Sequence, residues 1–293
     1  MDEERRSCII CSRGSYEAAT ETALVPCNVR KWLGSEFRVW RCGACRTIHS
    51  LKREDMVMFY KDYPYGRRSL DDVTRRIFDN YIRRLKGFGL ARQSTVLDYG
   101  CGEGLLVEYL RERGYAASNG FDPHSSRYND PEVLNRQYDV VISQDVIEHV
   151  EDPRQLMHDL SSLLRPGGII IIGTPRADGI DLSRIKPYIY SLHQPYHIHI
   201  LSEKVFLELA LEQGLQLLKL FHRDSSDTLY PFVNWRFLRG YLGALDDTLD
   251  AGFDPPRVDV VASSPRLLFL GLFGGILPLG YEMIGVFRKL DAG

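Results

Sequence analysis

The chain has 293 residues, of which 44% are hydrophobic and 26% are charged, and its formal net charge is −2. This composition is typical of a globular protein with a large core, and it excludes disordered and fibrous classes. The charge is unevenly distributed, because residues 1–93 carry 19 Lys and Arg against 12 Asp and Glu, whereas the remainder is acidic.

The first residues, Met-Asp-Glu-Glu-Arg-Arg, lack the apolar segment of a signal peptide, so we expect a cytoplasmic protein. Two Cys-x-x-Cys pairs follow, namely Cys8, Cys11, Cys42 and Cys45. Four thiolates at such spacing can bind a tetrahedral zinc ion, and the strand-like Phe37–Trp40 leads into the second pair as in a zinc ribbon. A four-cysteine site has no open position for substrate, so we expect structural Zn2+ within a ribbon over residues 1–58. A redox-active thiol pair is the alternative.

Residues 59–93 are predicted to form an aromatic linker followed by a helix. The linker runs from Phe59 to Tyr65 and contains four aromatic residues. Ser69, with Asp72 three residues later, is typical of a helix N-cap, and the apolar residues that follow recur at helical spacing until Gly87. We expect the arginines of this helix to lie on its solvated face.

A strand, a glycine-rich turn and a helix are predicted next. Val96–Asp98 is apolar and is followed by the turn Gly100–Gly104, whose glycines allow the backbone to approach a ligand closely. Leu105 stands where a dinucleotide fingerprint has its third glycine. A second strand ends at Asp122, about 20 residues after the central glycine, where such folds place the carboxylate that binds both ribose hydroxyls.

Strands and helices continue to alternate along the chain, which predicts a Rossmann-like α/β fold with a seven-stranded, mostly parallel sheet over residues 94–293. The predicted elements are a strand at 138–142, a helix capped by Asp152, strands at 169–172 and 215–220, a helix at 205–211 and a final strand at 281–289. Residues 223–280 are predicted to be a helical insertion before the last strand.

Successive motifs of this region resemble those of class I S-adenosylmethionine-dependent methyltransferases. They are Val96–Gly104, the strand that ends at Asp122, Asp139–Ile142 with Glu148-His149-Val150, and Leu164–Gly168. The resemblance implies a cofactor site made of Asp98, Tyr99, Gly100, Cys101, Gly102, Asp122, Pro123, Gln144 and Asp145. It also implies that the third strand, with its adenine contact, is shortened, because few residues separate Asp122 from Asp139.

The same resemblance suggests the chemistry. Methyl transfer needs mainly alignment, but a hydroxyl acceptor must also lose a proton, which suits a histidine. Asp145 to His149 is similar to the Glu-x-x-Glu-His of ubiquinone-pathway and small-RNA O-methyltransferases, where that motif helps to bind a divalent metal. His197 matches a loop above the active site in the family. We expect His149 or His197 to be the base, beside Glu148; a Mg2+ site and structural hydrogen bonding are the alternatives.

The insertion is rich in aromatic residues and is a candidate cover for the acceptor pocket, although these aromatics are also compatible with a simple core. The stretch from Leu267 to Tyr281 carries no charge but is shorter than the roughly 18–20 residues that span a bilayer, so no transmembrane helix is predicted. Its apolar residues, Leu267–Phe273, are predicted either to contact a lipid or membrane surface, or to be buried under the last strand.

The ribbon followed by a Tyr-rich linker is similar to a bacterial subgroup that acts on small molecules, sugars or lipids. We therefore expect O-methylation of such an acceptor with S-adenosyl-L-methionine as cofactor. An RNA methyltransferase, with the basic front segment facing phosphates, is one alternative, but the acidic remainder of the chain disfavours nucleic acid. A non-catalytic interaction protein is the other alternative.

Overall fold

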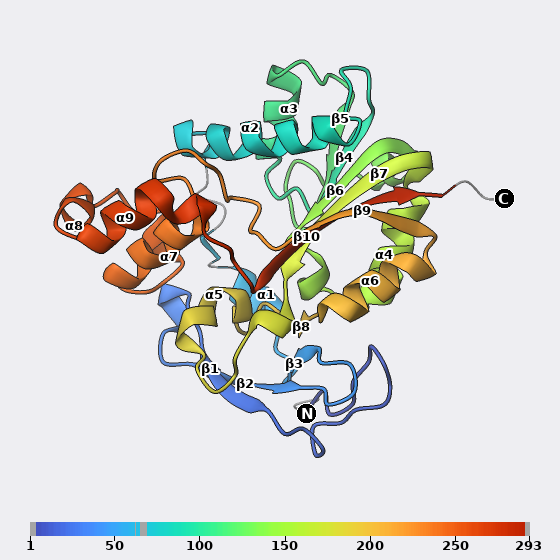
Figure 1. Ribbon diagram of the computed structural model, residues 1–293. Helices are drawn as coiled ribbons and strands as arrows, with labels where there is room; N and C mark the ends of the chain where they lie inside the picture. The colour runs from blue at the N-terminus through green and yellow to red at the C-terminus, as the bar shows by residue number, and fades with distance from the viewer. Residues whose placement is uncertain (1–3, 62, 65–68, 291–293) are drawn as a thin grey trace.

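A computed structural model of the chain describes residues 4–61, 63–64 and 69–290. Its main element is a sheet with the strand order β5-β4-β6-β7-β10-β9 (Figure 1). The strands are β4 (Val96–Tyr99), β5 (Ser118–Phe121), β6 (Tyr138–Gln144), β7 (Leu164–Pro175), β9 (Leu215–Phe221) and β10 (Glu282–Lys289). Strands β5, β4, β6 and β7 pair in parallel, whereas β10 pairs antiparallel with β7 and β9. The predicted Rossmann-like, mostly parallel α/β fold is confirmed.

The described residues form six strands in this sheet, so the predicted number of seven is wrong. Strand β5 is the outermost strand, and the chain between β5 and β6 forms only a short 3-10 helix, Pro131–Asn135. A crossover to a further parallel strand needs a dozen or more residues, and a return to β6 needs as many again. The sixteen residues between Asp122 and Asp139 are too few for both.

Helices cover both faces of the sheet (Figure 1). One face packs against α2 (Asp72–Gly87) and α3 (Leu105–Glu112), and the other against α4 (Pro153–Ser162) and α6 (Glu203–Glu212). Successive residues of β7 alternate between the two cores: Ile169 and Ile171 face α2 and α3, and Ile170 and Ile172 face α4 and α6. This double coverage explains the continuous apolar run in the sequence.

Side chains cap α2, α4 and α6, though not always at the predicted residue. The N-cap of α2 is Asp71, whose carboxylate accepts a hydrogen bond from the Thr74 N–H at 2.8 Å, so the prediction of Ser69 is wrong by two residues. Asp152 caps α4 as predicted. Part of the aromatic linker, at residues 62 and 65–68, lies outside the described residues.

A second sheet, ordered β1-β2-β3-β8, contains the N-terminal segment. Its strands are β1 (Thr22–Pro26), β2 (Glu36–Arg41), β3 (Ile48–Ser50) and β8 (His199–Ile200), and the short helices α1 (Met56–Tyr60) and α5 (Ile189–Leu192) lie nearby (Figure 1). Because β8 follows β7 in the chain, this sheet is shared between the ribbon and the α/β domain. One core cluster likewise contains Cys8, Cys42 and Cys45 together with Leu201 and Val205.

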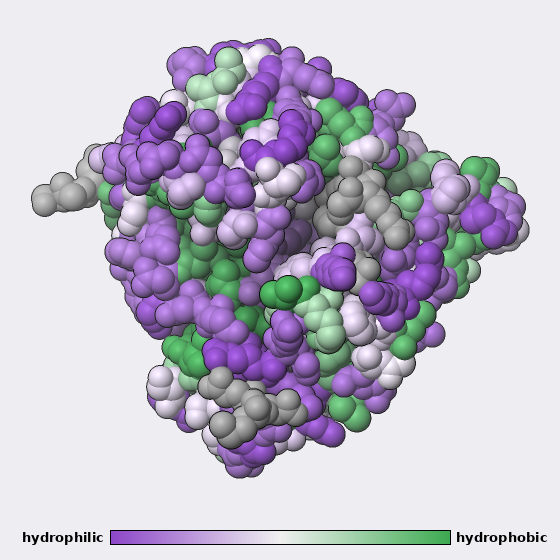
Figure 2. Space-filling view, turned by 180° about the vertical axis from the view of Figure 1, so that it is seen from behind, coloured by the Kyte–Doolittle hydropathy of each residue, from purple (hydrophilic) through white to green (hydrophobic). Residues whose placement is uncertain are grey.

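The predicted insertion forms α7 (Trp235–Ala244), α8 (Val258–Ala262) and α9 (Pro265–Phe273), which pack on one another beside the sheet (Figure 1). In α9 Leu267 and Gly271 are buried, whereas Leu268, Phe269, Leu272 and Phe273 are exposed, and Figure 2 shows apolar residues at the surface of this part of the molecule. The alternative of burial under the last strand is therefore wrong for most of α9. Within the described ranges, every helix is too short or too polar to cross a bilayer.

Candidate active site

The glycine turn lies between β4 and α3, at the carboxyl end of β4. Gly100, Gly102 and Gly104 have φ angles of 81°, 53° and 79°, in the left-handed region that favours glycine. A Cβ on Gly100 would collide with the side chain of Val146, and one on Gly104 with the ring of Tyr128. The turn therefore needs glycine for its backbone angles and for its packing.

Asp122 lies directly against this turn. One carboxylate oxygen accepts a hydrogen bond from the Gly102 N–H at 2.9 Å, and the other accepts from the His124 N–H at 2.8 Å. The two features that the sequence predicted to act together are thus in contact, and the carboxylate is held in one orientation. Pro123 follows it on the exposed side of the loop.

Asp98, at the end of β4, is buried, and burial followed by the charge of Asp122 raises the pKa of its carboxyl to about 7. Tyr99 is partly buried, and burial raises the pKa of its hydroxyl. Burial also raises the pKa of the Cys101 thiol, so this residue is protonated at neutral pH. The proton makes Cys101 a poor nucleophile.

The end of β6 forms the next part of the site. Asp145 is exposed and has a φ angle of 55°, an uncommon conformation for a residue other than glycine. The Gln144 amide donates a hydrogen bond to the Asp145 carboxylate at 2.9 Å. Gln144 Oε1 and Ser143 Oγ are buried without a hydrogen-bond partner among the described residues, so polar capacity remains for a ligand.

Glu148, His149 and His197 converge beside this edge, although His197 comes from the loop before β8. Their ligand atoms all lie within 4.8 Å of one another. Glu148 is fully buried; one oxygen accepts from Thr174 Oγ1 at 3.0 Å and the other lies 4.0 Å from His197 Nε2. Burial, followed by the charge of Asp145, raises the pKa of Glu148 well above its ordinary value.

Hydrogen bonds define which nitrogen of each histidine carries a proton. His149 Nδ1 lies 3.0 Å from the Tyr196 carbonyl oxygen, and His197 Nδ1 lies 2.8 Å from the Ser191 carbonyl oxygen. A carbonyl oxygen can only accept, so both Nδ1 atoms donate and both Nε2 atoms keep a free lone pair. Burial lowers the pKa of His149 to about 4 and lowers that of His197 well below its ordinary value, so both rings are neutral at pH 7.

Three residues of the site were not predicted from the sequence. The hydroxyl of Tyr60, in the aromatic linker, lies 3.1 Å from His149 Nδ1, and its ring stacks on His124 with centroids 5.8 Å apart. Tyr81, on α2, has a buried hydroxyl whose pKa is raised by burial and then by the charge of Asp98. The spacing of Tyr81 on its helix indicated only a core residue, and the linker pattern indicated only aromatic packing around Tyr60.

Glu282, at the start of β10, is the third such residue. It is buried, and it accepts a hydrogen bond from Ser191 Oγ at 2.5 Å. Burial, followed by the charge of Asp224, raises the pKa of its carboxyl well above the ordinary value, and Asp145 and Glu148 add to this effect. The one sequence signal for Glu282 was its position as a glutamate at the start of an apolar strand. The site thus contains more buried carboxyls than the motifs indicated.

The four cysteines of the ribbon meet at the edge of the second sheet. Sγ–Sγ distances are 3.6 Å between Cys8 and Cys45, 3.6 Å between Cys8 and Cys11, and 3.7 Å between Cys11 and Cys42. A disulfide would need about 2.05 Å, whereas a tetrahedron with Zn–S bonds of about 2.3 Å has sulfur atoms about 3.8 Å apart. Both the donor set and its geometry fit a zinc ion.

We predict one zinc ion per chain, measured by native mass spectrometry. Replacing Cys42 by Ser should abolish stoichiometric zinc and lower the melting temperature of the whole chain, because the cluster lies in the same core as α6. Cys27→Ser is the control: this thiol is buried outside the cluster, so the variant should lose some stability but keep its zinc. A Cys42→Ser protein that still holds one tightly bound zinc would contradict the assignment.

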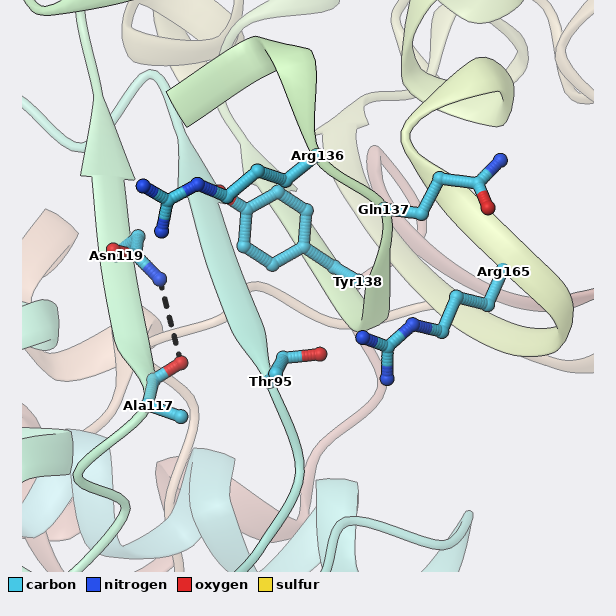
Figure 3. Close-up of a pocket in the computed structure, with 7 residues that line it drawn as sticks. All are labelled: Thr95, Ala117, Asn119, Arg136, Gln137, Tyr138 and Arg165. Carbon is cyan, nitrogen blue, oxygen red and sulfur yellow. Dashed lines mark hydrogen bonds between the residues drawn. The ribbon is translucent and has the colours of Figure 1, made fainter. Parts of the chain in front are cut away.

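A cavity of about 580 Å³ lies at the opposite end of the sheet (Figure 3). Its lining residues, Thr95, Ala117, Asn119, Arg136, Gln137, Tyr138 and Arg165, lie near the amino ends of β4, β5 and β6 and at the turn into β7. Its Arg165 pairs with Asp139 at 2.9 Å. In parallel α/β sheets ligands bind at the carboxyl ends of the strands, so this cavity is not the candidate site.

Known proteins resemble this chain in sequence and in fold. The family described as "Methyltransferase domain" matches residues 67–220. The ubiquinone biosynthesis O-methyltransferase of Dinoroseobacter shibae is 34% identical over an alignment of 125 residues, and the match covers 36% of this chain and 50% of that protein. Its namesake from Caulobacter vibrioides is 33% identical over 101 residues, 27% and 40% of the two chains. This chain therefore matches half or less of each relative's length.

Among solved structures, a SAM dependent methyltransferase from Archaeoglobus fulgidus superposes with a TM-score of 0.45 and 17% identity. The superposition covers 80% of this chain and 100% of that one.

Proposed function

The chain belongs to the methyltransferase-domain family, and on this basis we propose that it transfers a methyl group from S-adenosylmethionine to a hydroxyl oxygen of a small-molecule, sugar or lipid acceptor. The observation that carries the proposal is the contact between the glycine turn and Asp122, next to the cluster of Glu148, His149 and His197. This arrangement supports cofactor and acceptor sites that lie next to each other along one edge of the sheet.

We assign the cofactor contacts from this geometry. Asp122 would accept hydrogen bonds from both ribose hydroxyls, and the open backbone at Gly100 and Gly102 would lie against the methionine part. The positively charged sulfonium and ammonium groups would be placed near Asp98, whose ionised form they favour. Tyr81, with its buried hydroxyl near Asp98, adds a polar group on the α2 side.

The reaction needs one bond to form and one to break. An acceptor oxygen attacks the methyl carbon, the carbon–sulfur bond breaks with its electron pair going to sulfur, and the hydroxyl proton must be removed. We propose His197 as the base, because its unprotonated Nε2 faces Glu148 Oε1 at 4.0 Å. The hydroxyl proton passes to His197 Nε2, and the nearby Glu148 carboxyl oxygen stabilises the positive charge that forms on the imidazole ring. His149, beside it, would orient the acceptor.

A magnesium ion does not fit this cluster. Mg2+ prefers six oxygen ligands, whereas Glu148, His149 and His197 offer two imidazole nitrogens and one carboxylate. Asp145, which stands at the first position of the motif, does not belong to the group of converging ligand atoms. No step of the proposed reaction therefore depends on magnesium.

The apolar surface of α9 supports a lipid acceptor or contact with a membrane surface. Four large apolar side chains of this short helix are exposed, and Ile276 just beyond it is exposed as well. The relatives are named ubiquinone biosynthesis O-methyltransferase, which supports a small-molecule acceptor. A zinc-thiolate cluster persists in a reducing compartment, so we place the activity in the cytoplasm.

An RNA acceptor is less compatible with the charges of the N-terminal segment. Arg5 pairs with Glu151 at 2.6 Å and Arg30 pairs with Asp254 at 2.6 Å, so acidic residues of the later chain neutralise them. Arg41 is buried and donates to backbone carbonyl oxygens. These three arginines thus help to attach the ribbon to the rest of the molecule.

The test is transfer of a labelled methyl group to three acceptor classes, namely catechols, free sugars and polyprenylated phenols, with RNA as the fourth arm. We expect a methyl ether in one of the first three arms, formed together with one equivalent of S-adenosylhomocysteine. Labelling of RNA alone, with activity that falls steeply as salt increases, would favour the alternative. Absence of a calorimetric heat with S-adenosylmethionine would contradict methyl transfer altogether.

A further inference from the structure

A continuous set of backbone contacts joins the ribbon to the candidate active site. Strand β3 pairs with β8 so that His49 lies opposite His199. The Ser50 N–H donates to the Ile198 carbonyl oxygen at 3.0 Å, and the Ile198 N–H donates to the Glu148 carbonyl oxygen at 2.9 Å. Ile198 directly follows His197. The segment that carries the proposed base is thus held between the ribbon and Glu148.

The side chains of His49 and His199 reinforce this pairing. Their Nδ1 atoms are 3.0 Å apart, both rings are fully buried, and the Trp40 ring packs on His49 with centroids 4.7 Å apart. One Nδ1 must donate while the other accepts, so the two rings occupy complementary tautomers. Loss of either partner would leave a buried polar atom unsatisfied, which is more costly than losing an exposed hydrogen bond.

The cysteine cluster lies at the near end of the same segment. Strand β3 begins three residues after Cys45. Ser202, the N-cap of α6, donates its hydroxyl hydrogen to the Cys45 carbonyl oxygen at 2.7 Å. Residues 198–202 therefore contact the ribbon at both ends, through Ser50 and through Cys45. Movement of the cluster would be transmitted to this segment directly.

We propose that His49 is a positioning residue for the methyl-transfer site, through which the zinc ribbon holds the segment that carries His197. The importance of that segment for catalysis rests on the proposed function, but the mechanical link itself does not. The ribbon would accordingly be a structural component of the active site, and loss of its metal would loosen the His197 segment before the cofactor-binding turn.

Hydrogen exchange measured by mass spectrometry tests the link without knowledge of the acceptor. In His49→Phe, which keeps an aromatic ring on Trp40, amide exchange at residues 197–200 should be faster on the order of tenfold, while residues 96–104 stay unchanged. His49→Asn places an amide near the position of Nδ1 and should restore protection, whereas His49→Gln places it one carbon farther and should not. Removal of zinc from the wild type by a chelator should loosen the same residues.

Zinc content and S-adenosylhomocysteine binding, measured on each variant, separate this proposal from the proposed function. Both should stay at wild-type values in the His49 variants, and His158→Phe, which removes an exposed histidine hydrogen bond, is the matched control. Unchanged exchange at residues 197–200 in zinc-bound His49→Phe, or equal exchange in the Asn and Gln variants, would overturn the link. If His49→Phe does not fold, the comparison of His49→Asn with His49→Gln decides whether the link exists. Missing cofactor binding in the wild type would instead count against the proposed function alone.

Discussion

Replacing Asp122 by Ala is expected to weaken binding of S-adenosylmethionine on the order of 100-fold, because two charge-assisted hydrogen bonds to the ribose, each contributing about 1.5–3 kcal/mol, are lost together. In the wild type, the Asp122 carboxylate accepts hydrogen bonds from the N–H groups of Gly102 and His124. The variant leaves both N–H groups without this acceptor. Titration calorimetry with S-adenosylmethionine and S-adenosylhomocysteine should show the same loss for both, since they share the ribose.

Asp130→Ala provides a matched control for this experiment. Asp130 also accepts a hydrogen bond from the N–H two residues later, that of Glu132 at 3.0 Å, but it is exposed and lies beyond the cofactor-binding turn. Its replacement should leave the affinity unchanged. Asp122→Asn, which keeps the shape but not the charge, should fall between the two. An Asp122→Ala protein with wild-type affinity would contradict the assignment of the ribose site.

Replacing His197 by Ala is expected to reduce kcat by about 10²–10⁴-fold, the usual contribution of a general base, with little change in cofactor affinity. Steady-state transfer to the acceptor identified in the labelling experiment gives kcat, and calorimetry gives the affinity. His222→Ala is the control, because this exposed histidine pairs with Glu203 at 2.8 Å and lies outside the proposed site. Wild-type turnover in His197→Ala would exclude this residue as the base.

The pH dependence of the wild type should carry the signature of a buried base. Burial, followed by the nearby His149 and His193, lowers the pKa of His197 well below its ordinary value. A base is active when unprotonated, so a lowered pKa extends activity toward acid. We expect kcat/KM to stay level from about pH 8 down to about pH 6, where a histidine of ordinary pKa near 6.5 would already lose activity. A decline centred on that ordinary pKa would indicate an exposed base.

Local patterns in the sequence were sufficient for much of the fold. The order of strands and helices, the cap at Asp152 and the turn at Gly100–Gly104 follow from periodicity and from residue types that favour one backbone conformation. The missing third strand was also visible as a short interval after Asp122, although the count of seven strands did not take it into account. The N-cap of α2 was predicted at the wrong residue because Ser69 and Asp71 are both residue types that favour that position. Backbone geometry decides which of the two side chains reaches the free N–H group.

The candidate site was predicted in parts rather than as a whole. Asp122 and the glycine turn were expected to meet because parallel strands end at one edge of the sheet. The hydrogen bonds between His149 and Tyr60 and between Ser191 and Glu282, by contrast, join residues far apart in the chain, and nothing local to any of these residues indicates its partner.

The sequence by itself determined the elements whose causes are local: the cysteine pairs, the left-handed glycine turn and the alternation of strands and helices. Only the tertiary structure decided that β8 extends the ribbon sheet, that Glu148 and the two histidines converge, and that their proton affinities shift. The physical reason is that burial and pairing depend on which distant segments exclude water from a side chain. Strand pairing and desolvation are properties of the packed chain, whereas turn and helix preferences already exist in a few consecutive residues.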